Sequence, residues 1–115
     1  MNYLFVCTYN INRSVAAAKV FSELLLKYDI EANIRDAGIS ETAKNRITKE
    51  LINWADKIYV MQNIHKTYIE NIVPKAREKI NVLGIEDIYQ MNDPNLLLIL
   101  KRKFRKEIMN GNITR

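Results

Sequence analysis

Cys7 and Arg13 are the residues whose types and spacing most directly predict chemistry. A cysteine thiolate is a strong nucleophile, and a guanidinium offers a planar fork that binds two phosphate oxygens together. The segment between them is a short polar turn, in which backbone N–H groups can surround an anion. The pattern therefore predicts a phosphate-binding loop with a cysteine nucleophile, and its remaining members are Thr8, Tyr9, Asn10, Ile11, Asn12 and Ser14.

The flanking residues predict how this loop is positioned. Residues 3–7 are apolar strand formers, and apolar side chains at helical spacing follow the loop up to about Asp29. Ser14 is of a type that caps helices at the N-terminus. A strand, a loop and a helix in this order place the thiol at a strand end and beside the positive end of a helix, where the ionised thiol is favoured.

Strand and helix patterns alternate through the rest of the chain. Strands are expected over 32–35, 57–61 and 80–83, and helices over 44–55, 64–72 and from Asp93 onward. Asp36-Ala37-Gly38 is read as the turn that closes the second strand. This order predicts a single α/β domain over residues 1–115: a three-layer, doubly wound, four-stranded parallel sheet with helices on both faces. Such sheets bind ligands beyond the carboxyl ends of their strands, where the loop after the first strand lies.

The last helix has the clearest start signal. Asp93 is expected to cap it, because Pro94 suits the first helical position, where no amide hydrogen is needed. Its inner face is expected to carry Leu97, Leu100, Phe104 and Ile108.

Composition limits the possible environments and partners. A single cysteine excludes an internal disulfide and a multi-cysteine metal site, and it suits a reducing, cytoplasmic location. No run reaches the roughly 18 apolar residues of a membrane span. The formal charge of +5 favours anionic partners. The expected partner is a phosphorylated protein or a small phosphate ester, without nucleic acid or membrane.

The predicted loop implies a reaction without metal or cofactor. Cys7 would attack phosphorus to give a phosphocysteine, which water then hydrolyses. The loop amides and Arg13 would stabilise the equatorial oxygens, where transition-state charge is spread. Two roles for Ser14 stay open: its hydroxyl donates to the sulfur, or it only caps the helix.

The sequence resembles the low-molecular-weight protein tyrosine phosphatases, whose signature reads Val-Cys-x-x-Asn-Ile-x-Arg-Ser. The matching residues are Val6, Cys7, Asn10, Ile11, Arg13 and Ser14. Asp36-Ala37-Gly38 is similar to the family's Ser-Ala-Gly, and residues 54–61 are similar to its third strand. The resemblance implies a four-stranded parallel sheet, a thiol nucleophile and an aspartate general acid in a C-terminal Asp-Pro-Tyr loop.

Two positions compete for that acid. Asp87 is favoured because it follows the fourth strand directly, in a segment that differs from the family loop by Ile88 in place of proline. Asp93 keeps the Asp-Pro pair but has the pattern of a helix cap. Tyr89 would then line the substrate entrance together with Tyr9, which replaces a common family glycine. Asn12 stands where many members have a second cysteine.

Other functions remain open at this stage. A phosphocysteine carrier of sugar-transport type would have a cysteine after the first strand but no arginine clamp. A noncatalytic anion or RNA binder would need aromatic platforms, for which Tyr68 and Phe104 are candidates. His65 is interpreted as a surface or packing residue.

Overall fold

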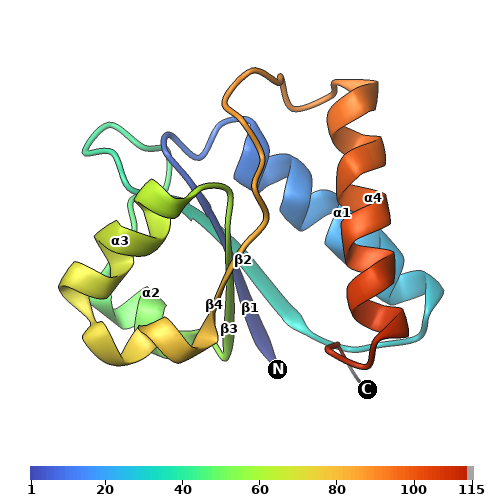
Figure 1. The fold of residues 1–115 in the computed structure, drawn as a ribbon, viewed down its shortest axis with the longest axis horizontal. Coiled ribbons are helices and arrows are strands. Elements are labelled where there is room, and N and C mark those ends of the chain that lie inside the picture. The colour runs from blue at the N-terminus through green and yellow to red at the C-terminus, as the bar shows by residue number, and fades with distance from the viewer. Residues whose placement is uncertain (114–115) are drawn as a thin grey trace.

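The computed structural model describes residues 1–113 and has the predicted α/β architecture, with a central parallel sheet between two layers of helices (Figure 1). Helices α1 and α4 cover one face of the sheet, and α2 and α3 cover the other. The elements in chain order are β1 (Asn2–Cys7), α1 (Arg13–Lys27), β2 (Asn33–Gly38), α2 (Lys49–Trp54), β3 (Lys57–Val60), α3 (Asn63–Ile72), the 3-10 helix η1 (Pro74–Lys79), β4 (Ile80–Val82) and α4 (Pro94–Met109).

The strands lie in the order β2-β1-β3-β4, and every pairing is parallel. Cys7, the last residue of β1, lies opposite Gly38, the last residue of β2. Val6 lies opposite Val60, the last residue of β3. Because the strands run the same way, their carboxyl ends meet at one edge, and the loops that follow β1, β3 and β4 leave the sheet together.

Alternate residues of β1 face two separate apolar layers. Tyr3, Phe5 and Cys7 belong to the layer formed with α1 and α4, and Leu4 and Val6 to the layer formed with α2 and α3. All five are buried, which is the pattern of a central strand covered on both faces.

An aromatic cluster fixes α1 and α4 on the sheet. The ring of Phe21 from α1 lies 5.1 Å from that of Phe5 and 5.1 Å from that of Phe104 of α4, measured between centroids. Phe104 also meets Tyr59 of β3 edge-on at 5.7 Å. Tilted and edge-on rings at these separations are favourable arrangements. The cluster packs the middle of α1 against the sheet, and the first turn of the same helix follows the loop after Cys7.

Two predicted boundaries in the middle of the chain were wrong. The second strand extends to Gly38, because residues 36–38 pair with the end of β1 instead of forming a turn. The second helix starts at Lys49, not at residue 44. Residues 45–47 run extended beside Gly38, whose N–H donates to the Asn45 carbonyl and whose carbonyl accepts from Ile47 N–H. Thr48 then caps α2 by accepting from the Leu51 amide at 3.1 Å.

The start of α4 agrees with the prediction. Asp93 accepts a hydrogen bond from the Asn95 amide at 2.8 Å, and Pro94 occupies the first helical position. The inner face differs by one position: Leu96 is buried with Leu100 and Phe104, and Leu97 and Ile108 pack at the margin of the same layer. Within residues 1–113, no helix combines the length and apolar character needed to cross a membrane.

Candidate active site

The predicted phosphate-binding loop, residues 8–14, leaves β1 directly after Cys7 and ends in the first turn of α1. Its carbonyl side is held by the segment that follows β2: the carbonyls of Cys7, Thr8 and Tyr9 accept from the amides of Ile39, Ser40 and Lys44 at 3.1, 2.9 and 3.1 Å. Within residues 1–113, the backbone N–H groups of residues 8–12 have no hydrogen-bond partner. These donors are therefore free for an anion held beside the thiol.

Asn10 gives the loop its sharp turn. Its φ of 56° lies in the left-handed region, which asparagine tolerates better than most residues. Its side-chain amide donates to Ser14 Oγ at 2.8 Å and to Asp36 Oδ1 at 2.9 Å. The side chain thus ties the loop both to the first turn of α1 and to β2.

Ser14 does not cap the helix. Helix α1 already begins at Arg13 with Asn12 in the cap position, so Ser14 lies inside the first turn. Its Oγ lies 3.0 Å from Cys7 Sγ and accepts from the Asn10 amide. With that acceptor position filled, the hydroxyl hydrogen is available to the sulfur when the thiol is ionised. Of the two roles that the sequence left open, the contact with the sulfur is the one observed.

Arg13 is buried and held on one side by neutral acceptors. Its Nη1 donates to Gln62 Oε1 at 2.6 Å and to the Ile85 carbonyl at 2.8 Å. These bonds use both hydrogens of Nη1. Among the described residues, the other edge of the guanidinium, formed by Nε and Nη2, has only long contacts, 3.5 Å to Asp87 Oδ1 and 3.5 Å to Thr8 Oγ1. That edge can bind two oxygens of a phosphate.

His65 belongs to the site, which the sequence did not predict. It is fully buried near the start of α3. Its Nδ1 accepts from the Gln62 backbone N–H at 3.0 Å, so in the neutral ring Nε2 carries the hydrogen and donates it to Thr8 Oγ1, 3.0 Å away. The Thr8 hydroxyl is thereby an acceptor on one side and keeps its own hydrogen for the loop interior.

The surroundings of His65 keep the ring neutral. Burial is the largest effect and the positive charge of Arg13 adds to it, so that the pKa of His65 falls from 6.5 to about 4 despite the opposing influences of Asp87 and of the Gln62 hydrogen bond. Neutral His65 has the donor and acceptor pattern that the network requires.

The two candidate acids occupy different places. Asp87 lies on the loop after β4, with its carboxylate 3.5 Å from Arg13 Nε and its side chain 60% exposed. Asp93 is engaged as the cap of α4. The structure therefore brings Asp87 to the phosphate-binding loop and gives Asp93 a structural partner elsewhere.

A small hollow of about 50 Å³ opens above the thiol, and it is lined by Cys7, Thr8, Tyr9, Ile11, Asn12, Arg13 and Asp87. This volume can hold a few water molecules or one phosphoryl group, but it is too small for a whole substrate. Tyr9 and Ile11 are exposed at its rim. Tyr89 is outside this lining and packs against the layer of α1 and α4.

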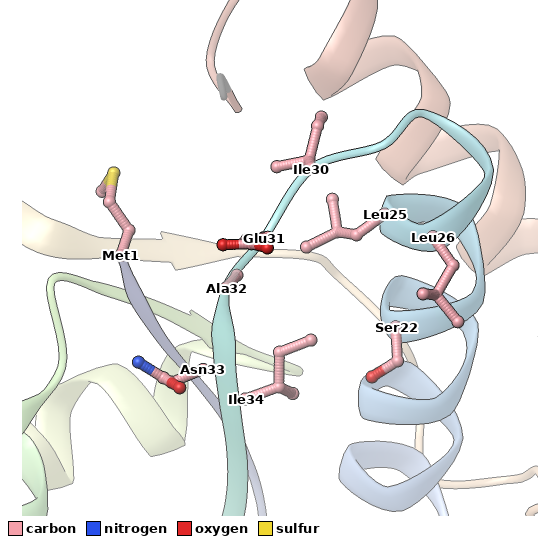
Figure 2. Close-up of a pocket in the computed structure, with 9 residues that line it drawn as sticks. All are labelled: Met1, Ser22, Leu25, Leu26, Ile30, Glu31, Ala32, Asn33 and Ile34. Carbon is pink, nitrogen blue, oxygen red and sulfur yellow. The ribbon is translucent and has the colours of Figure 1, made fainter.

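A larger shallow hollow of about 900 Å³ lies at the other end of the sheet, near Met1 and Asn33 (Figure 2). Leu25, Leu26 and Ile34 point toward it from α1 and β2. Its lining contains neither a cysteine nor an arginine. The nucleophile, the guanidinium and the free amides all converge at the opposite strand ends.

Comparison with known proteins agrees with this arrangement. Residues 2–57 match the family model for low molecular weight phosphotyrosine protein phosphatases. The N-terminal half of the chain is therefore similar to this family. The matched segment contains Cys7, Arg13 and the loop between them, and the protein is a cysteine-dependent phosphatase. No match was found among curated proteins.

Solved structures share the fold over nearly the whole chain of this phosphatase. A low molecular weight phosphotyrosine phosphatase from Vibrio cholerae O395 aligns with a TM-score of 0.80 at 16% identity, covering 97% of each chain. The tyrosine phosphatase Wzb from Escherichia coli K30, solved with phosphate, aligns at 0.76 and 23% identity, covering 95% of this chain and 96% of its own. The arginine phosphatase YwlE from Geobacillus stearothermophilus aligns at 0.68 and 21% identity, covering 99% of each.

Proposed function

We propose that this phosphatase hydrolyses aryl phosphate monoesters, with phosphotyrosine on a protein or a small aryl phosphate as substrate. The observation that carries the proposal is the convergence on one small hollow of the Cys7 sulfur, the Nε–Nη2 edge of Arg13 and the loop amides, which have no hydrogen-bond partner within residues 1–113. Cys7 attacks phosphorus, and the phosphoryl group passes to the sulfur as the bond to the leaving oxygen breaks.

Asp87 is the proposed general acid. Its carboxylate oxygen lies near the guanidinium edge that a phosphate would use, so substrate binding displaces this ion pair and leaves the carboxyl beside the leaving oxygen. In its protonated form it gives its proton to that oxygen as the phosphorus–oxygen bond breaks, and the resulting carboxylate can then take a proton from the water that hydrolyses the phosphocysteine. Ser14 donates to the sulfur as it leaves in this second step.

The rim of the hollow supports an aryl leaving group. Tyr9 and Ile11 are 49% and 57% exposed and offer apolar surface beside the phosphate-binding loop, against which an aromatic ring can pack. A phosphoarginine substrate, as in the neighbours named arginine phosphatases, would instead present a charged guanidinium to these apolar side chains. We therefore place phosphotyrosine ahead of phosphoarginine.

A noncatalytic RNA-binding role has less support. Phe104, one of the two possible stacking platforms, is fully buried, and Tyr68 packs against the layer of α2 and α3. A carrier role is disfavoured by the buried arginine clamp, which stabilises the transition state of a hydrolase. We also propose a cytoplasmic location, because the reaction requires the sole cysteine to be reduced.

The test is hydrolysis of phenyl phosphate with a metal chelator present. We expect wild-type turnover to be unaffected by the chelator, Cys7→Ser to be inactive, and Asp87→Asn to lose about a hundredfold. Asp93→Asn is the matched control, because asparagine also caps helices, and it should keep nearly full activity. Peptides carrying phosphotyrosine or phosphoarginine then compare the two leaving groups. Activity in Cys7→Ser would refute the mechanism, and a preference for phosphoarginine would refute the substrate class.

A further inference from the structure

The segment between β4 and α4 carries Asp87 and contains neither helix nor strand. We call residues 85–91 the acid loop. Residues 86–88 are exposed, so the position of the Asp87 carboxyl depends on how the two ends of the acid loop are held. Ile85 at one end is buried, and Met91 at the other end is partly buried.

Two adjacent residues of the phosphate-binding loop hold these two ends. Arg13 Nη1 donates to the carbonyl of Ile85 at 2.8 Å. Asn12 Oδ1 accepts from the backbone N–H of Met91 at 3.0 Å. The acid loop is therefore fastened at both ends to consecutive residues of the loop that binds phosphate.

We propose that Asn12 is a positioning residue that acts through Asp87: its hydrogen bond to Met91 holds the acid loop where the Asp87 carboxyl can protonate the leaving oxygen. The proposal rests on the function proposed above. Within residues 1–113, the Asn12 side chain makes no hydrogen bond besides the one to Met91, and it makes no capping bond to α1 although it occupies the cap position. Its loss should therefore cost the helix little.

The chemistry of the side chain suits this role. An amide oxygen is a good acceptor for a backbone N–H, whereas a thiol sulfur is a weak one. The bond between the Asn12 side chain and Met91 thus depends on the amide group that this chain has at position 12.

A series of substrates with increasingly poor leaving groups tests this proposal, because a badly placed acid slows a poor leaving group more than a good one. The series runs from para-nitrophenyl phosphate through phenyl phosphate to an alkyl phosphate. For Asn12→Ala we expect kcat/KM, which reports the step that expels the leaving group, to fall about fivefold more on phenyl phosphate than on the nitrophenyl ester, as the removal of one typical hydrogen bond allows. The inhibition constant of inorganic phosphate reports any separate effect on the phosphate-binding loop, and we expect it to change less than kcat/KM on phenyl phosphate.

Two further variants separate positioning from general damage. Asn12→Asp keeps an acceptor oxygen for the Met91 amide. The dependence of kcat/KM on the leaving group should therefore be that of wild type, even if the added charge raises KM for all substrates. In the Asp87→Asn background, Asn12→Ala should have no further effect on phenyl phosphate, since the acid is already absent.

The outcomes are distinguishable from failure of the proposed function. If wild type hydrolyses none of these esters, the phosphatase proposal fails. If wild type is active but Asn12→Ala lowers kcat/KM equally for all leaving groups, or adds a full loss in the Asp87→Asn background, Asn12 does not act through Asp87 and the positioning proposal is overturned.

Discussion

Lowering the pH should destabilise this protein through one residue, His65, which is the only histidine in the chain. Its pKa falls from 6.5 to about 4 on folding, so between these pH values the unfolded chain binds a proton that the folded chain does not. The contribution of neutral His65 to the free energy of unfolding is complete above about pH 6.5 and is lost progressively as the pH falls toward 4. The total loss is about 3 kcal/mol, at no more than roughly 1.4 kcal/mol per pH unit.

The assay is urea denaturation between pH 7.5 and pH 4, in phosphate-free buffer of constant ionic strength because an oxyanion beside Arg13 would alter the titration. His65→Gln is the matched variant: glutamine can accept from the Gln62 amide and donate to Thr8, but it does not titrate. The wild-type free energy of unfolding should fall below its neutral value by about 3 kcal/mol more than that of the variant.

Proton NMR gives an independent reading, since a single histidine produces one pair of ring signals. Their titration midpoint should lie near 4. A midpoint between 6 and 7, or parallel pH profiles of the wild type and His65→Gln, would show that the ring is not the buried neutral partner of Thr8 described above.

Three further substitutions have defined expectations. Gly38→Ala would place a Cβ 2.6 Å from the Thr8 carbonyl oxygen. The substitution should therefore displace the phosphate-binding loop, lower the free energy of unfolding by about 1 to 3 kcal/mol and reduce kcat/KM. Unchanged activity would contradict this close approach. Ser14→Ala should slow hydrolysis of the phosphoenzyme more than its formation, so that a burst of phenol precedes a slower steady rate. A missing burst would argue against a hydrogen bond from Ser14 to the departing sulfur. Phe104→Ala should lower the free energy of unfolding by about 3 to 5 kcal/mol in urea titrations, because it removes a ring from the aromatic cluster. The control Leu98→Ala, at an exposed position, should lower it by about 0.5 kcal/mol. Similar values for both variants would contradict the aromatic cluster.

The sequence predicted the features that depend on neighbours along the chain. The strand, loop and helix around Cys7 lie within a short segment, and their residue types express that order directly. The cap and proline at the start of α4 are equally local signals. The fold class followed from the alternation of such segments, and it is confirmed.

The features that the sequence did not predict depend on contacts between distant segments. Residues 45–47 have helical spacing but lie extended, because Gly38 offers them backbone partners. Ser14 has the type of a cap, but Asn10 and Cys7 engage its hydroxyl. His65 bonds locally to the Gln62 amide, but its place in the site comes from Thr8, which is distant in sequence and directly follows β1.

The fastening of Arg13 in the folded chain has a consequence for ligand binding. Its guanidinium is immobilised by Gln62 and by the Ile85 carbonyl through bonds that do not involve the phosphate-facing edge. Immobilising an arginine side chain reduces its conformational entropy, at a free-energy cost of up to about 2 kcal/mol. Here the side chain is already immobilised when the chain folds, so ligand association does not carry this cost. Even small, featureless tetrahedral anions such as vanadate or sulfate should therefore compete well with far larger substrates.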